Sequence, residues 1–125
     1  ANQGYSDAQN NLGKMYFFGN GVRRDYEEAR KLFKQAADEG NSDGQNSLGI
    51  IYYDGLGIKQ NYGEALKLFQ QAADQGNAEA QNNLAGLYEE GKGVKKNPAK
   101  AIEWYRKAAE KGNTDAIDAL KRLDK

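Results

Sequence analysis

The sequence repeats itself with a period of 36 residues. Gly-x-Gly triplets begin at Gly19, Gly55 and Gly91, and the residues between them recur at equivalent positions. A repeat of this length forms one supersecondary unit, which cannot bury its own apolar face and is stable only when it stacks on a neighbour. The chain is therefore predicted to fold as a stack of equivalent units rather than around one central core.

Three complete units can be assigned within the 125 residues. They span 5–40, 41–76 and 77–112; a shorter segment, 113–125, follows, and residues 1–4 resemble the end of a preceding unit. In the short segment, Ile117, Lys121 and Asp124 replace the glutamine, glycine and tyrosine of the full units. Because charges oppose the docking of a further unit, we expect 113–125 to be a capping helix that ends a single solenoid domain, 1–125.

The first half of each unit carries apolar or small residues at every fourth position, which is one face of an α-helix. These residues are Ala8, Leu12 and Tyr16; Gly44, Leu48 and Tyr52; and Ala80, Leu84 and Tyr88. A glycine or alanine follows each leucine and lets another helix approach closely, while the Gly-x-Gly triplet ends the helix because glycine adopts positive φ. We expect the three tyrosines in the core. Gly44 replaces an alanine and is expected to weaken the start of its helix.

The second half of each unit has the signals of a helix start. Asp25, Asn61 and Asn97 are N-cap residues, and Pro98 suits the first helical position. The apolar stripe combines an aromatic residue with a pair of alanines, which offers a flat surface to the next unit. Its members are Ala29, Phe33, Ala36 and Ala37; Ala65, Phe69, Ala72 and Ala73; and Ala101, Tyr105, Ala108 and Ala109. Together the patterns predict helices over residues 6–18, 26–39, 42–54, 62–75, 78–90, 98–111 and 114–124.

The composition excludes several kinds of site. The sequence has no histidine and no cysteine, which removes histidine-based triads, thiol nucleophiles, disulfides and ordinary zinc sites. Adjacent acids such as Glu89 and Glu90 point in different directions on a helix, so they do not form an acid–base pair. The Gly-x-Gly triplets lack the lysine and the strand of a phosphate-binding loop. We therefore predict no catalytic residue, no cofactor, no metal site and no enzymatic activity.

Charge and hydropathy bear on partners and location. Lysine and arginine together number 18, and aspartate and glutamate together also number 18, so the net charge is zero. No overall field therefore attracts nucleic acid or anionic lipid, and no nucleic-acid partner is expected. No apolar run approaches the roughly 18 residues of a membrane-spanning helix, and no signal stretch opens the chain. A soluble protein is expected. Because a removed leader leaves no trace, the cytoplasm and the periplasm or secretory pathway both stay open.

The combined pattern resembles the Sel-one-like repeat (SLR) family, the 36-residue relatives of the tetratricopeptide repeat. The resemblance rests on Ala-x-x-x-Leu-Gly-x-x-Tyr-x-x-Gly-x-Gly-Val, a capping Asp or Asn, Ala-x-x-x-Phe/Tyr-x-x-Ala-Ala and a terminal glycine, and it covers essentially the whole chain. It implies an all-α fold, an α/α right-handed superhelical solenoid of helix–turn–helix repeats whose first helices line the concave side. It also implies a non-catalytic scaffold for protein–protein interaction.

On that resemblance, one face of the first helices lines a binding groove. Its positions are Asn10, Lys14 and Phe17; Asn46, Ile50 and Tyr53; and Asn82, Gly86 and Glu89. An asparagine in each unit suits hydrogen bonding to an extended peptide, because its amide both donates and accepts. Alternatively, the asparagines tie adjacent helices together or cap turns. The order of side chains favours a ligand with an acidic end toward the first unit, an apolar middle and a basic end toward the third.

Three functions stay open at this point. The pattern favours a scaffold that binds a protein or peptide in the groove. One alternative is a structural spacer within a longer array; another is an enzyme acting on bacterial cell walls, suggested only by disulfide-linked relatives in the repeat family and opposed by the lack of cysteine. Phe17, Phe18 and Tyr53 fall off the core stripe and are candidates for recognition. The N-terminal side has no cap, so Leu12, Met15 and Tyr16 are expected to be partly exposed and to offer a surface for a homodimer.

Overall fold

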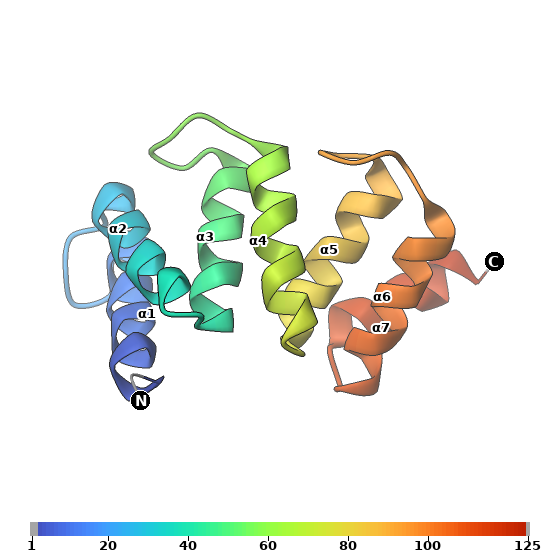
Figure 1. Cartoon of the computed structure of the whole chain (residues 1–125), viewed down its shortest axis with the longest axis horizontal. Helices are drawn as coiled ribbons and strands as arrows, with labels where there is room; N and C mark the ends of the chain where they lie inside the picture. The colour runs from blue at the N-terminus through green and yellow to red at the C-terminus, as the bar shows by residue number, and fades with distance from the viewer. Residues whose placement is uncertain (1–2, 125) are drawn as a thin grey trace.

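The computed structural model describes residues 3–124, and over this range it consists of helices and the loops between them. The helices are α1 (Gln3–Phe18), α2 (Tyr26–Asp38), α3 (Ser42–Asp54), α4 (Tyr62–Asp74), α5 (Ala78–Glu90), α6 (Pro98–Glu110) and α7 (Thr114–Leu123). They follow one another along the long axis, with α1 and α7 at opposite ends (Figure 1). Each helix packs against the next one in the chain. The predicted all-α repeat solenoid is confirmed.

The helix boundaries agree with the sequence prediction within one residue except at the start of α1. This helix begins at Gln3 instead of residue 6. Helices α3, α5 and α7 each begin after an N-cap asparagine, at Asn41, Asn77 and Asn113. Tyr5 holds the equivalent position in the first unit and has no side-chain oxygen near enough to cap the backbone. Because no capping residue fixes the start, the helical conformation extends further toward the N-terminus.

The N-cap asparagines also join consecutive repeats. The Oδ1 atom of Asn77 accepts a hydrogen bond from Ala80 N at 2.9 Å and caps α5. Its Nδ2 atom donates to Asp43 Oδ1 at 2.8 Å and to Ser42 Oγ at 3.3 Å, in the first turn of α3. Asn41 likewise caps α3 by accepting from Gly44 N, and its Nδ2 atom donates to Ser6 and Asp7 of α1. The position uses a donor and an acceptor on separate atoms, which the asparagine amide supplies.

Replacing Asn77 with aspartate should lower the free energy of unfolding by about 1–2 kcal/mol. The cap acceptor survives, but the donor is lost and a second carboxylate lies beside Asp43. The matched control is Asn61→Asp, because Asn61 caps α4 through Glu64 N and the first unit already has Asp25 there. We expect the control to change stability by less than about 0.5 kcal/mol. Urea unfolding followed by circular dichroism measures both; equal losses at the two sites would contradict the inter-repeat role.

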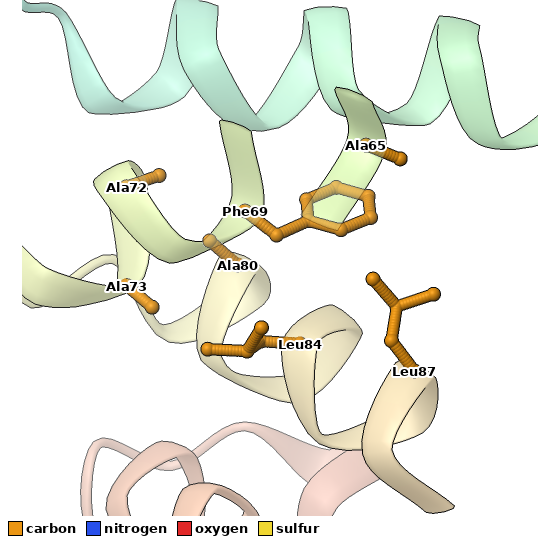
Figure 2. Packing of buried hydrophobic residues seen from close by; sticks show 7 residues of the cluster. All are labelled: Ala65, Phe69, Ala72, Ala73, Ala80, Leu84 and Leu87. Atoms are coloured by element: carbon orange, nitrogen blue, oxygen red, sulfur yellow. The ribbon is translucent and has the colours of Figure 1, made fainter. Parts of the chain in front are cut away.

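The core consists of clusters that bridge neighbouring helices. Figure 2 shows one of them, in which Phe69 of α4 lies against Leu84 and Leu87 of α5, together with small alanines from both helices. Phe69 is only 2% exposed, as is Phe33 of α2, and the alanine stripes are largely buried as predicted. Large apolar side chains of one helix thus meet the alanines of its neighbour, which is how consecutive units cover each other's apolar faces.

The three predicted tyrosines pack against the core but are not its most buried members. Tyr16, Tyr52 and Tyr88 are half-buried, and each packs against one or two of the clusters. Ile51 and Leu87, three residues after the core leucines, are 0% and 1% exposed. Positions three and four residues apart share a helix face, and the purely apolar side chain takes the buried position. A tyrosine at the edge keeps its hydroxyl in contact with water.

Two glycines permit close helix contacts. A Cβ atom at Gly49 would lie 2.7 Å from the ring of Phe69, which confirms the expected close approach beside the leucine. A Cβ atom at Gly44 would lie 2.6 Å from the Cβ of Ala36 and 3.0 Å from the backbone nitrogen of Ala37. Gly44 is therefore where α3 touches α2, and the helix begins at its cap like α5. The expected weakening of this helix start by the glycine stays a prediction.

The outer face of α1 carries exposed apolar side chains. Leu12 and Met15 are each 40% exposed, and Tyr16 is half-buried, so their expected partial exposure is confirmed. Leu48 and Ile51, at the equivalent positions of α3, are buried in a cluster with residues of α2. Association of two copies through the α1 face stays a prediction.

Candidate peptide-binding groove

Three hollows lie in a row along the face lined mainly by the odd-numbered helices. The first hollow has a volume of about 240 Å³ and is lined by Lys14, Phe17, Phe18, Phe33, Asn46, Ser47, Ile50 and Glu79. The second, of about 340 Å³, is lined by Ile50, Tyr53, Asp54, Phe69, Asn82, Asn83, Gly86, Glu90 and Tyr105. The third, of about 380 Å³, is lined by Asn82, Tyr105, Asp115, Asp118, Ala119 and Arg122. Adjacent hollows share lining residues, Ile50 between the first and the second and Asn82 and Tyr105 between the second and the third, and together we call the three hollows the groove.

Most of the predicted site residues line this groove. Seven of the nine do so: Lys14, Phe17, Asn46, Ile50, Tyr53, Asn82 and Gly86. Asn10 is only 3% exposed and lines none of the three hollows. Glu89 lies at the end of α5 and is paired with side chains of α6 and α7. The helix periodicity thus placed most of these residues along the same hollows, while their contact with a ligand stays a prediction.

Several lining residues were missed as groove positions. Phe18 was identified as a recognition candidate, but neither it nor Asp54 was assigned to the groove; each follows directly after a predicted groove residue at the end of its helix. Tyr105 belongs to a second helix and was assigned to the core. Its hydroxyl lies beside Gly86 in the second hollow, where a Cβ atom at the glycine would be 3.8 Å from the hydroxyl oxygen, an ordinary contact distance. The residues of α7 were expected only to cap the stack, so no signal pointed to them.

The asparagines do not form a ladder of equivalent amides. Asn46 donates from Nδ2 to Glu79 Oε2 at 3.3 Å and accepts at Oδ1 from Asn83 Nδ2 at 2.9 Å. Both functions of its amide are therefore used to tie α3 to α5, as the alternative interpretation describes. Asn10 is buried. Only Asn82 is half-buried in the groove without a side-chain hydrogen bond to any residue between 3 and 124.

A network of three side chains closes the C-terminal end of the groove. Arg122 of α7 binds the Glu89 carboxylate through two nitrogens, at 2.6 and 3.0 Å, and Tyr105 donates to the same carboxylate at 2.7 Å. The Arg122 hydrogen bond lowers the pKa of Glu89 most, against the opposing effect of burial. Burial and the bond to Glu89 raise the pKa of Tyr105, so its phenol stays protonated. Glu89 is therefore not the free acidic group that we expected.

The Glu89–Arg122 pair should make stability depend on acidic pH. Because the pKa of Glu89 is lowered below its ordinary value of 4.5, the pair stabilises the fold above that pH, and its contribution is lost as pH falls through the lowered pKa. Wild type should therefore unfold at a higher temperature than Glu89→Gln at neutral pH, and the difference should shrink below pH 4.5. Thermal unfolding of both proteins at several pH values measures this. A difference that does not change with pH would show that the pair is not formed.

Tyr53 is held in place by the loop after α5. Lys92 donates to Tyr53 Oη at 3.0 Å, and its Nζ atom lies 5.1 Å from the Tyr53 ring centroid and 5.4 Å from that of Tyr62. This hydrogen bond raises the pKa of Lys92. Glu90 accepts from the Tyr53 hydroxyl and pairs with Lys92 at 3.7 Å. Tyr53 is thus fixed at the wall of the second hollow, and the charge of Glu90 is compensated.

A membrane-spanning helix and a cluster of metal ligands are both absent from the described residues. No helix between residues 3 and 124 has the length and apolar character needed to cross a membrane. Within the same residues, no group of three or more carboxylates is placed to hold a metal ion.

Comparison with known proteins identifies the repeat. The sequence profile of the Sel1 repeat matches residues 6–41, 42–77 and 78–113. Among solved structures, the chain resembles c5321, described as a protective antigen present in uropathogenic Escherichia coli strains displaying an SLR fold, with 40% identity and a TM-score of 0.90. It also resembles a Sel1 repeat protein from Oxalobacter formigenes, with 33% identity and a TM-score of 0.87. Helicobacter pylori cysteine rich protein B, at 21% identity and a TM-score of 0.77, shares the fold.

The matches differ in how much of each protein they cover. The alignments cover 98% of this chain but 26% of the E. coli protein, and 94% of this chain but 48% of the Oxalobacter protein. For H. pylori cysteine rich protein B the shares are 94% and 91%. No curated protein matches the sequence. Proteins built from Sel1 repeats are generally scaffolds for protein interaction and typically non-catalytic. Since three repeats account for nearly the whole chain, it belongs to the Sel1 repeat family.

Proposed function

We propose that the chain binds an extended segment of a partner protein along the groove. The observation that supports this most is that three neighbouring hollows share lining residues, Ile50 between the first and the second and Asn82 between the second and the third. Neighbouring hollows across the odd-numbered helices suit an extended chain. Its polar side chains hydrogen-bond the ligand backbone, and its hollows receive alternate side chains.

The first hollow supplies the apolar anchor point. Phe17 packs against Phe18 and Phe33, with ring centroids 4.8 and 6.3 Å apart, and Ile50 completes the wall. Phe18 is 63% exposed, an unusual state for a phenylalanine in a folded protein. Aromatic residues are enriched among those that dominate the binding energy at interfaces. We therefore place the strongest contact of the bound segment in this hollow.

Selection from a random peptide library displayed on phage tests this function. Peptides selected on the immobilised chain should bind it in solution, and Phe18→Ala should weaken their binding by about tenfold or more. The matched control is Tyr5→Ala. Tyr5 is 64% exposed on the same helix but lines none of the hollows, and its replacement should leave affinity unchanged.

The alternative functions predict other results. If the chain is a structural spacer, its surface binds nothing, and the selection gives no peptide whose affinity differs between Phe18→Ala and Tyr5→Ala. Peptides that lose affinity with Tyr5→Ala but not with Phe18→Ala would place the binding surface outside the groove and contradict the proposal.

A further inference from the structure

We infer that the bound segment is a basic peptide with one apolar anchor residue. This inference rests on the proposed function and specifies the chemistry of its ligand. The anchor occupies the first hollow, and lysine or arginine side chains lie over the second and third hollows. The inference depends on which charges in the groove are already paired within the protein.

The positive and negative charges nearest the C-terminal end cancel each other. Arg122 forms two hydrogen bonds with Glu89, and Lys92 pairs with Glu90. These four groups therefore add little net charge to the groove. Glu89 and Glu90 therefore do not provide the unpaired acidic end of the groove that we expected, because both carboxylates are paired with cations.

Three carboxylates in the second and third hollows remain. Asp54 lines the second hollow, and Asp115 and Asp118 line the third; all three are exposed, and none forms an ion pair with a residue between 3 and 124. The only cation lining these two hollows is Arg122, which Glu89 already binds. A fourth carboxylate, that of Glu79, lines the first hollow and accepts a hydrogen bond from Asn46. A ligand with positive charge over the second and third hollows is complementary to their unpaired carboxylates.

Asp54 stands where helix electrostatics disfavour it. It is the last residue of α3, and the C-terminal end of a helix carries partial negative charge that favours cations over carboxylates. Its carboxylate forms no hydrogen bond with any residue between 3 and 124. Replacing Asp54 with asparagine should therefore leave stability unchanged or slightly higher, which separates an effect on binding from an effect on folding.

The spacing of the ligand side chains follows the spacing of the helices that line successive hollows. Neighbouring packed helices lie about 10 Å apart, which an extended peptide crosses in about three residues. The probe ligand thus has an apolar residue followed, at steps of about three positions, by lysine or arginine. Both Lys14 and Glu79 line the first hollow, so we assign no charge to the residue on the other side of the anchor.

Synthetic peptides of about ten residues test the inference. The probe carries one phenylalanine and two lysines spaced in this way, and it is made in both chain directions. One twin has glutamate in place of the lysines, and another has alanine in place of phenylalanine. We expect the better direction of the probe to bind at least about tenfold more tightly than either twin, measured by fluorescence anisotropy. Binding should weaken as salt rises from about 50 mM to about 500 mM.

Matched protein variants complete the test. The double variant Asp54→Asn with Asp118→Asn should weaken probe binding about tenfold. The control is Asp74→Asn, which removes one carboxylate charge from the last residue of α4, outside the groove, and should have no effect. Equal binding of the lysine and glutamate peptides, or an affinity that the double variant does not change, would overturn the inference. Library peptides that depend on Phe18 but carry no basic residues would overturn it too, while leaving the proposed function intact. If no peptide depends on Phe18, both fail.

Discussion

Replacing Phe69 with alanine is expected to lower the free energy of unfolding by about 3–5 kcal/mol. The side chain is 2% exposed and belongs to α4, yet it contacts elements on both sides. Its ring fills the space left by Gly49 of α3 and packs in one cluster with Leu84 and Leu87 of α5 (Figure 2). Removing the ring therefore leaves a cavity between two consecutive repeats.

The readout distinguishes loss of coupling from local damage. Urea unfolding gives the change in free energy, and native-state hydrogen exchange should show lost protection in α3, α4 and α5 together. The matched control is Phe18→Ala, which removes the same ring from a position that is 63% exposed and should change stability by less than about 0.5 kcal/mol. Loss of protection confined to α4 would contradict a core that is shared between repeats.

Replacing Gly93 with alanine is expected to cost about 2–4 kcal/mol, from two separate causes. Gly93 has φ of +73°, in the left-handed region that alanine adopts only with strain. A Cβ atom there would also lie 2.6 Å from the carbonyl oxygen of Tyr62, in the backbone of the preceding repeat. Since a backbone atom cannot swing away, the loop after α5 must separate from the start of α4.

A second glycine separates the two causes. Gly112 has φ of +87°, but no atom lies within 4 Å of the position a Cβ would take. Gly112→Ala should therefore lose only the conformational part, about 1 kcal/mol. Chemical unfolding of both variants gives the difference, which measures the contact between repeats. If both substitutions cost the same, the close approach of Gly93 to α4 is not a feature of the fold in solution.

The repeat period and the cap residues determined most of what the sequence could predict about the fold. The helix starts followed from Asn61, Asn97 and Pro98, and the buried alanine pairs followed from the apolar stripe. Tyr52 packs against the core as predicted but is only half-buried, because helix periodicity does not distinguish two positions on the same face and Ile51 takes the fully buried one. The double role of Asn77 was also missed, since it depends on the neighbouring repeat lying against the cap.

The groove was less predictable than the fold. Periodicity identified Ile50 and Tyr53, which belong to one helix face. It did not identify Tyr105 or Asp118, because these reach the groove from helices whose position depends on packing. Nor did the sequence show that Glu89 is neutralised, since its partner Arg122 lies 33 residues away. Pairing between distant charges decides which of them face a ligand.

Titration of the nitrogen-15-labelled chain with a selected peptide, followed by NMR, tests the groove most directly. If a bound segment runs along the three hollows, amide shifts should move together near Phe18 of α1, Tyr53 of α3, Asn82 of α5 and Asp118 of α7. Lys67 and Gln71 of α4, which line a separate hollow on another face, should not move. Shifts confined to Lys67, Gln71 and their neighbours, with none near Tyr53, would contradict a binding groove on the odd-numbered helices.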